Sequence, residues 1–108
     1  MTVNLVDLVQ PGAVVCGLAS DDRDTAITEL LDRLVTAGTI SNHRRDDLLT
    51  RVLERERVVS TGFGRGVAVP HVKHPEVDRI AAAIGISGPG IDFKSLDGQP
   101  VYTVVLLV

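Results

Sequence analysis

The sequence predicts a single α/β domain in which a mixed β-sheet is flanked by helices. Two segments, 21–37 and 42–56, show the apolar spacing of helices, and the last eight residues, 101–108, form a near-continuous apolar run. Such a run is typical of a strand covered on both faces, which requires helices on both sides of its sheet. The length of 108 residues and the 44% apolar content fit one domain, residues 1–108, packed with aliphatic side chains.

The first strand is expected at residues 13–17, after an apolar opening segment that ends at Pro11 and Gly12. This strand contains the single cysteine of the chain, Cys16, so an internal disulfide is excluded. In its run of small and β-branched residues, Cys16 is interpreted as a small core residue.

The first helix, residues 21–37, is the strongest element of the pattern. Its apolar positions recur at helical spacing and comprise Ala26, Ile27, Leu30, Leu31, Leu34 and Val35. Ser20 or Asp21 can accept hydrogen bonds from the free amides of the first turn, and Gly38 is expected to end the helix.

The second helix is expected over residues 42–56, with Ser41 or Asn42 as its cap. Its predicted buried positions are Leu48, Leu49, Val52 and Leu53. Its carboxyl end, residues 54–57, carries only charged side chains.

The second half of the chain alternates turns and strands. Three glycines within residues 62–66 precede a short strand at 67–69. A buried strand is predicted at 79–87, followed by a turn at 88–90. A further turn at 97–100 leads into the last strand.

The charge of the chain argues against nucleic acid and anionic membranes as partners. The formal net charge is −3 and the isoelectric point is about 5.5. The densest basic stretch, 43–45, is followed at once by two aspartates, which indicates a solvated helix face. No segment approaches the roughly 20 apolar residues of a spanning helix, and the amino terminus lacks a secretory signal. We therefore expect a cytoplasmic protein without direct membrane insertion.

His71 is the central candidate for chemistry. A neutral imidazole is a nucleophile near pH 7 and can accept a phosphoryl group, while Pro70 and the preceding strand would orient the ring. The neighbouring glycines allow a backbone to approach an anion closely. The same local sequence is also compatible with a histidine that has only a structural role at the end of a strand. His71 and His74 also form a His-x-x-His pair, but only His43 and Cys16 remain as further soft ligands, so no metal site is predicted.

Arg55 and Glu56 lie at the end of the second predicted helix, before the glycine-rich segment. A guanidinium matches phosphate oxygens in a bidentate manner. The charged run at residues 54–57 is also typical of a solvent-exposed helix end. Thr61 offers a hydroxyl in the same loop, where it would serve equally as a turn cap.

Residues 55–71 read Arg-Glu-Arg-Val-Val-Ser-Thr-Gly-Phe-Gly-Arg-Gly-Val-Ala-Val-Pro-His. This tract closely resembles the signature of the fructose/mannitol-type enzyme IIA domains of the bacterial phosphoenolpyruvate-dependent sugar phosphotransferase system, in which the histidine after the proline is phosphorylated. The resemblance continues through residues 83–85, 90–93 and 97–101, and it is greatest to the nitrogen-regulatory branch.

The resemblance implies a histidine phosphotransferase, a phosphocarrier that needs no cofactor or metal. His71 would accept the phosphoryl group from the phosphocarrier protein HPr, and Arg55 would contribute positive charge. The implied lining of the phosphoryl site is Thr61, Gly62, Gly64 and Gly66, with Glu56 and Ser60 as further candidates.

Two uses of the phosphoryl group are implied. The protein would relay it to an enzyme IIB partner in sugar transport, or use it as a signal to a target protein in nitrogen regulation. The alternative is a non-catalytic or truncated enzyme IIA-like module that binds and regulates a partner protein.

The sequence departs from the family pattern at two places. Val72 stands where a small residue such as glycine often follows the active histidine. Family members usually continue for about another third of this length, into helices and a second active-site histidine that have no counterpart here. We therefore expect a C-terminally short domain, whose uncovered terminal strand would favour self-association.

Overall fold

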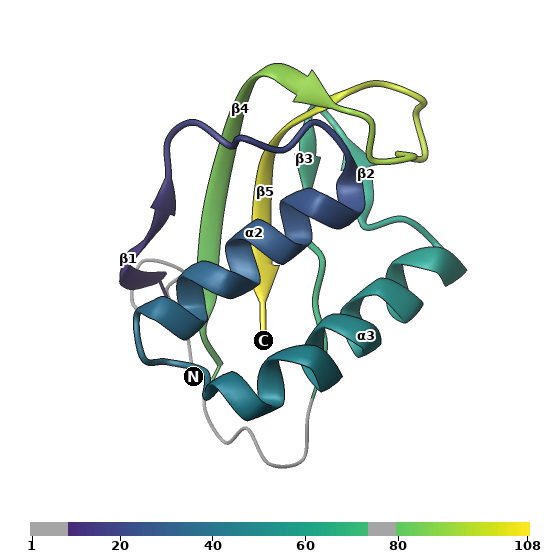
Figure 1. Ribbon diagram of the computed structural model, residues 1–108. Coiled ribbons are helices and arrows are strands. Elements are labelled where there is room, and N and C mark those ends of the chain that lie inside the picture. The colour runs from purple at the N-terminus through teal and green to yellow at the C-terminus, as the bar shows by residue number, and fades with distance from the viewer. Residues whose placement is uncertain (1–8, 74–79) are drawn as a thin grey trace, which may run out of the picture.

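The computed structural model describes residues 9–73 and 80–108, which form a five-stranded mixed sheet and two helices (Figure 1). The strands across the sheet are β1 (Val9–Val15), β4 (Ala82–Ile91), β5 (Val101–Leu107), β3 (Val67–Ala68) and β2 (Gly62–Gly64). β1 runs parallel to β4 and β3 runs parallel to β5, whereas the β4–β5 and β2–β3 pairs are antiparallel. The predicted α/β class with a mixed sheet is confirmed.

Helix α2 (Arg23–Thr36) begins two residues after its predicted start at residue 21. Its N-cap is Asp22, whose carboxylate accepts from the Thr25 amide at 2.9 Å. The prediction of Ser20 or Asp21 as cap is wrong, because the Ser20 hydroxyl donates to Glu29 at 2.8 Å instead. The predicted end is confirmed, since Gly38 follows the C-cap with a φ of 80° that favours glycine.

Asp22→Ala is expected to lower the melting temperature, because the amide of Thr25 loses its acceptor. The bond from that amide holds the pKa of Asp22 below its ordinary value of 3.8. Because the pKa is lowered in the folded state, the contribution of this carboxylate is present at neutral pH and is lost as the pH falls through the folded pKa. Thermal unfolding at neutral pH and near pH 3 should therefore show a wild-type advantage that narrows in acid. An advantage of equal size at both pH values would contradict this assignment.

Helix α3 (Asn42–Val58) packs mainly on α2, and it extends two residues beyond its predicted end. Ser41 is the N-cap residue, although its side chain makes no capping hydrogen bond. Arg45 joins the two helices, with its guanidinium 2.8 Å from Asp32 of α2. Of the predicted apolar face, Leu48 and Val52 are buried, whereas Leu49 and Leu53 are only partly buried.

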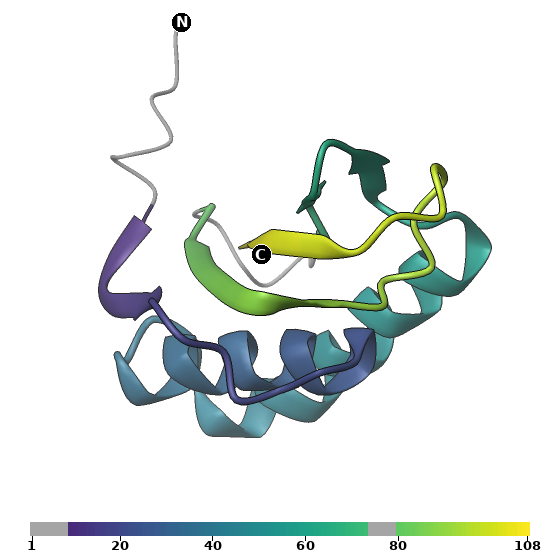
Figure 2. The same ribbon diagram turned by 90° about the horizontal axis from the view of Figure 1, so that it is seen from above.

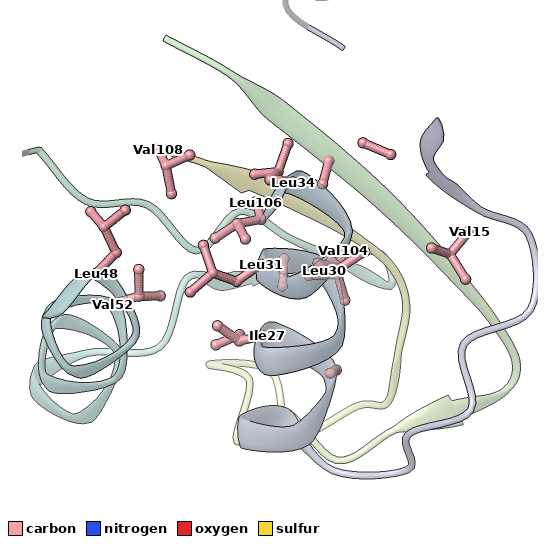
Figure 3. Packing of buried hydrophobic residues seen from close by; sticks show 14 of the residues in the cluster. Val15, Ile27, Leu30, Leu31, Leu34, Leu48, Val52, Val104, Leu106 and Val108 are labelled. Atoms are coloured by element: carbon pink, nitrogen blue, oxygen red, sulfur yellow. The ribbon is translucent and has the colours of Figure 1, made fainter. Parts of the chain in front are cut away.

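The core lies between the helices and one face of the sheet (Figures 2 and 3). Figure 2 shows α2 and α3 together on this face, beneath β4 and β5. The fully buried side chains of α2 are Ala26, Ile27, Leu30, Leu31 and Leu34, as its spacing predicted. On β5, Val104 and Leu106 are buried against them, whereas the alternate residues Val105 and Leu107 are only partly covered.

The opposite face of the sheet carries apolar side chains without a helix over them. Among the described residues, Val14, Val67 and Ile86 are 47%, 39% and 41% exposed. In the part of the chain that the structure describes, helices therefore cover only one face of β5, in agreement with the expectation of an uncovered terminal strand. No helix in residues 9–73 and 80–108 has the length and apolar character needed to cross a membrane.

Two local predictions are corrected by the sheet. Cys16 is exposed rather than buried, because it lies just beyond β1, next to the inward-facing Val15. The turn expected at residues 88–90 is instead part of β4, which continues to Ile91 with a register shift after Ile86. Gly90 has a φ of 90° there and lies against the ring of Tyr102, where a side chain would be both strained and crowded.

Candidate functional site

His71 lies just beyond β3, beside the end of the central strand β5. Its backbone forms a bridge with Leu107, whose amide donates to Pro70 at 3.0 Å and whose carbonyl accepts from Val72 at 3.2 Å. The histidine itself is exposed. The sheet therefore fixes the backbone on both sides of an accessible imidazole.

The imidazole of His71 is oriented by a hydrogen bond to a backbone carbonyl two residues earlier. Nδ1 lies 2.9 Å from the carbonyl oxygen of Val69. Because a carbonyl oxygen can only accept, the hydrogen must be on Nδ1. In the neutral ring the lone pair then lies on Nε2, which makes Nε2 the nucleophilic atom.

Arg55 lies in the last turn of α3, and its Nη1 donates to the carbonyl of Val59 at 2.7 Å. This bond uses one of the five N–H donors of the guanidinium, so the others can contact an anion. No hydrogen bond joins Arg55 to His71 in the described structure. The segments that carry Arg55 and His71 are nevertheless joined. Val59, which accepts the Arg55 bond, is two residues from Thr61. The Thr61 carbonyl accepts from the amide of Val69 at 3.2 Å.

Glu56 and Thr61 are buried together, with exposures of 1% and 0%. The Thr61 amide lies 3.2 Å from both carboxylate oxygens of Glu56, and the Thr61 hydroxyl also donates to Oε1. The Thr61 hydroxyl is thus directed at Glu56 inside the molecule. That Thr61 lines a phosphoryl site stays a prediction, and its observed role is to join the turn to α3.

Ser60 is also buried, and it ties the same turn to a distant segment. Its hydroxyl donates to the carbonyl of Phe93 at 3.1 Å and accepts from the amide of Gly62 at 3.0 Å. The Gly62 carbonyl in turn accepts from Leu96 at 3.0 Å. Sequence reasoning missed this support, because the partners lie more than thirty residues apart and no local pattern indicates the contact.

The glycines expected near the phosphoryl group occupy two different places. Gly62 packs against Ser95 and Ser60, where an added Cβ would collide with the Ser95 hydroxyl. Gly64 and Gly66 have φ values of 120° and 75° and form the turn between β2 and β3.

The pairing of β3 and His71 with β5 shows how far the turn at Gly64 and Gly66 lies from the histidine. Val67 pairs with Thr103, whereas His71 pairs with Leu107. At about 3.3 Å per residue, Gly66 is thus about 16 Å from His71 along the strand. A lining role for Gly64 and Gly66 stays a prediction, and their positive φ values give them a definite role in the turn.

No group of three or more His, Cys, Asp or Glu side chains suited to a metal ion occurs within residues 9–73 and 80–108. His74 of the His-x-x-His pair lies outside these residues.

Comparison with known proteins matches residues 7–108 to the family described as "Phosphoenolpyruvate-dependent sugar phosphotransferase system, EIIA 2". A fructose-specific EIIABC component of Bacillus subtilis is 32% identical over 105 residues, which cover 97% of this chain and 16% of that protein. A nitrogen regulatory protein of Bradyrhizobium diazoefficiens is 34% identical over 104 residues, covering 96% of this chain and 66% of that protein. The chain thus spans less than two thirds of the length of these two relatives.

Solved structures show the same fold. The nitrogen regulatory protein IIA-Ntr of Neisseria meningitidis superposes with a TM-score of 0.83 at 25% identity, covering 96% of this chain and 70% of that one. IIA mannitol of Escherichia coli gives a TM-score of 0.75 at 19% identity, covering 89% and 67%. Because the family match spans nearly the whole chain, the protein belongs to the EIIA 2 family of the phosphoenolpyruvate-dependent sugar phosphotransferase system.

Proposed function

We propose that this protein is a histidine phosphocarrier, in which Nε2 of His71 accepts a phosphoryl group from a phosphohistidine on the phosphocarrier protein HPr. The observation that carries the proposal is the bond from Nδ1 to the Val69 carbonyl, which leaves Nε2 of an exposed ring free to react. Membership of the EIIA 2 family supports the choice of reaction.

In the proposed transfer, a P–N bond forms at Nε2 of His71 as the P–N bond of the donor breaks. The bonding pair of that broken bond remains on the donor imidazole. The positive charge that develops on the His71 ring is favoured by the Val69 carbonyl, which still accepts from Nδ1. The remaining donors of Arg55 would contact the phosphoryl oxygens, so that charge is held by a guanidinium rather than by a metal.

The supporting roles of the other candidates follow from their contacts. Glu56, Thr61 and Ser60 hold the turn after α3, and Gly62 allows that turn to pack closely. Direct contact of Thr61 or of the glycines with the phosphoryl group is a further prediction. The proposed functional unit is one domain, residues 1–108, acting in the cytoplasm where HPr would supply the phosphoryl group.

Two onward uses of the phosphoryl group have support. An enzyme IIB acceptor is supported by the solved complex of enzyme IIA mannitol with phosphorylated enzyme IIB from Escherichia coli, to which this chain is similar in fold. A regulatory use is supported by the nitrogen regulatory protein of Bradyrhizobium diazoefficiens. In that case the added negative charge on His71 would switch binding to a target protein.

The test is to incubate the 108-residue chain with phosphoenolpyruvate, enzyme I and HPr, and to follow its intact mass. We expect one acid-labile phosphoryl group, with phosphorus–nitrogen coupling at Nε2 of a single histidine. Addition of enzyme IIB then separates the two uses, because only a relay passes the group onward. A chain that is folded by circular dichroism and gains no phosphoryl group would overturn the proposal.

A further inference from the structure

Glu56 is a buried ionisable residue that the proposed transfer does not use directly. It is 1% exposed and lies in the last turn of α3. Burial of a carboxyl group is costly unless hydrogen-bond donors satisfy its oxygens. Thr61 provides these donors with its amide, 3.2 Å from both oxygens, and with its hydroxyl. The carboxyl group of Glu56 thus holds the turn against the end of α3.

Thr61 is bonded in turn to the segment that carries the imidazole. Its carbonyl accepts from the Val69 amide at 3.2 Å, and the Val69 carbonyl accepts from Nδ1 of His71 at 2.9 Å. A continuous series of hydrogen bonds therefore leads from Glu56 through Thr61 and Val69 to the ring. On its other side the segment is held by Leu107 of β5.

We infer that Glu56 is a positioning residue for the proposed reaction. By fixing Thr61 it keeps the Val69 carbonyl where it accepts the Nδ1 hydrogen, and this maintains the tautomer in which Nε2 is nucleophilic. Glu56 acts only through Thr61 and Val69, since its own carboxyl group is buried against the turn. The inference rests on the proposed function of His71.

A purely structural role for Glu56 makes a different prediction. In that case its loss would lower the free energy of unfolding, while the His71 tautomer in the folded molecules would not change. Val52 supplies the matched control, because it is buried on α3 one turn before Glu56 and is not part of the series of hydrogen bonds. Val52→Ala should therefore lower the free energy of unfolding without changing the tautomer of the His71 ring.

The experiment measures the ¹⁵N chemical shifts of the His71 ring in the full unphosphorylated chain, together with the kinetics of transfer from phosphorylated HPr. For Glu56→Ala we expect the Nδ1-protonated fraction to fall about twofold or more, since one side of the supporting segment is released. We expect kcat to fall about tenfold with little change in KM, because binding of the donor does not involve Glu56. Glu56→Gln keeps an acceptor for the Thr61 amide and should restore the wild-type tautomer.

Unchanged tautomer fractions in folded Glu56→Ala would overturn the inference. If that variant does not fold, Thr61→Val replaces it, because valine is nearly isosteric with threonine and removes only the hydroxyl bond to Glu56. A tautomer shift in Thr61→Val would support the inference, and its absence would refute it. The ring measurement requires no phosphorylation, so a chain that responds in its tautomer but takes no phosphoryl group would disprove the proposed function alone.

Discussion

His71→Ala is expected to abolish phosphorylation of the chain while leaving its fold intact. The variant removes Nε2, the nucleophile that the bond from Nδ1 to Val69 leaves free. The atom of that bond that remains, the Val69 carbonyl oxygen, cannot replace it. Intact-mass measurement with phosphoenolpyruvate, enzyme I and HPr should show labelling reduced to background, a loss of about 10³-fold or more.

The fold should tolerate this change, because the imidazole of His71 is exposed and its bond to Val69 is local. We expect the free energy of unfolding to change by no more than about 0.5 kcal/mol, as is usual for surface substitutions. The bonds that attach this segment to Leu107 use backbone atoms and are retained in the variant. Loss of labelling can then be attributed to the missing ring.

His43→Ala is the matched control, since His43 is an exposed histidine at the first turn of α3. The His43→Ala variant should be phosphorylated at the wild-type rate. Persistent labelling of His71→Ala, or loss of labelling in His43→Ala, would remove the assignment of His71. Labelling of both variants would point to an acceptor elsewhere in the chain.

Much of the fold could be predicted because several elements depend on local patterns. The six-position apolar repeat of α2 and the positive φ of Gly38 both follow from the sequence of that segment alone. The predicted cap is wrong by one position within a run of four residues, Ser20 to Arg23, in which three side chains are able to cap a helix. The choice of Asp22 depended on Ser20 finding a tertiary partner in Glu29.

Other features depend on contacts that no local pattern contains. The Gly88–Gly90 segment has the composition of a turn, yet the register with β5 extends β4 through it to Ile91. The contact of Ser60 with Phe93 likewise joins segments far apart in the sequence. In both cases tertiary pairing outweighed the local preference.

The sequence indicates His71 as the central residue of the candidate site more clearly than it indicates the contacts that support this residue. The motif that ends at His71 is continuous in sequence, so it could be found there. The burial of Glu56 also had a signal, because it continues the four-residue spacing of Leu48 and Val52 on the inner face of α3. A charged side chain on that face indicates a buried partner, and the structure supplies it in Thr61.

Leu31→Ala is expected to destabilise the protein by about 2–5 kcal/mol, the range observed when a buried leucine is truncated. Leu31 is completely buried, and Figure 3 shows it pointing from α2 toward Leu48 and Val52 of α3. Because α3 packs mainly on α2, the cavity would form where few other contacts hold the second helix. Thermal or denaturant unfolding should show the loss, with a melting temperature lower by on the order of 10 °C.

Leu96→Ala makes the same chemical change at a side chain that is 64% exposed, and it should cost far less. A loss below about 1 kcal/mol in Leu31→Ala would mean that the cluster repacks around the missing side chain. The transfer kinetics should not depend on Leu31, because the His71 segment is held by backbone bonds to β5. At temperatures where Leu31→Ala remains folded, its transfer rate should match the wild type, which would separate the stability of the helical layer from the chemistry of the histidine.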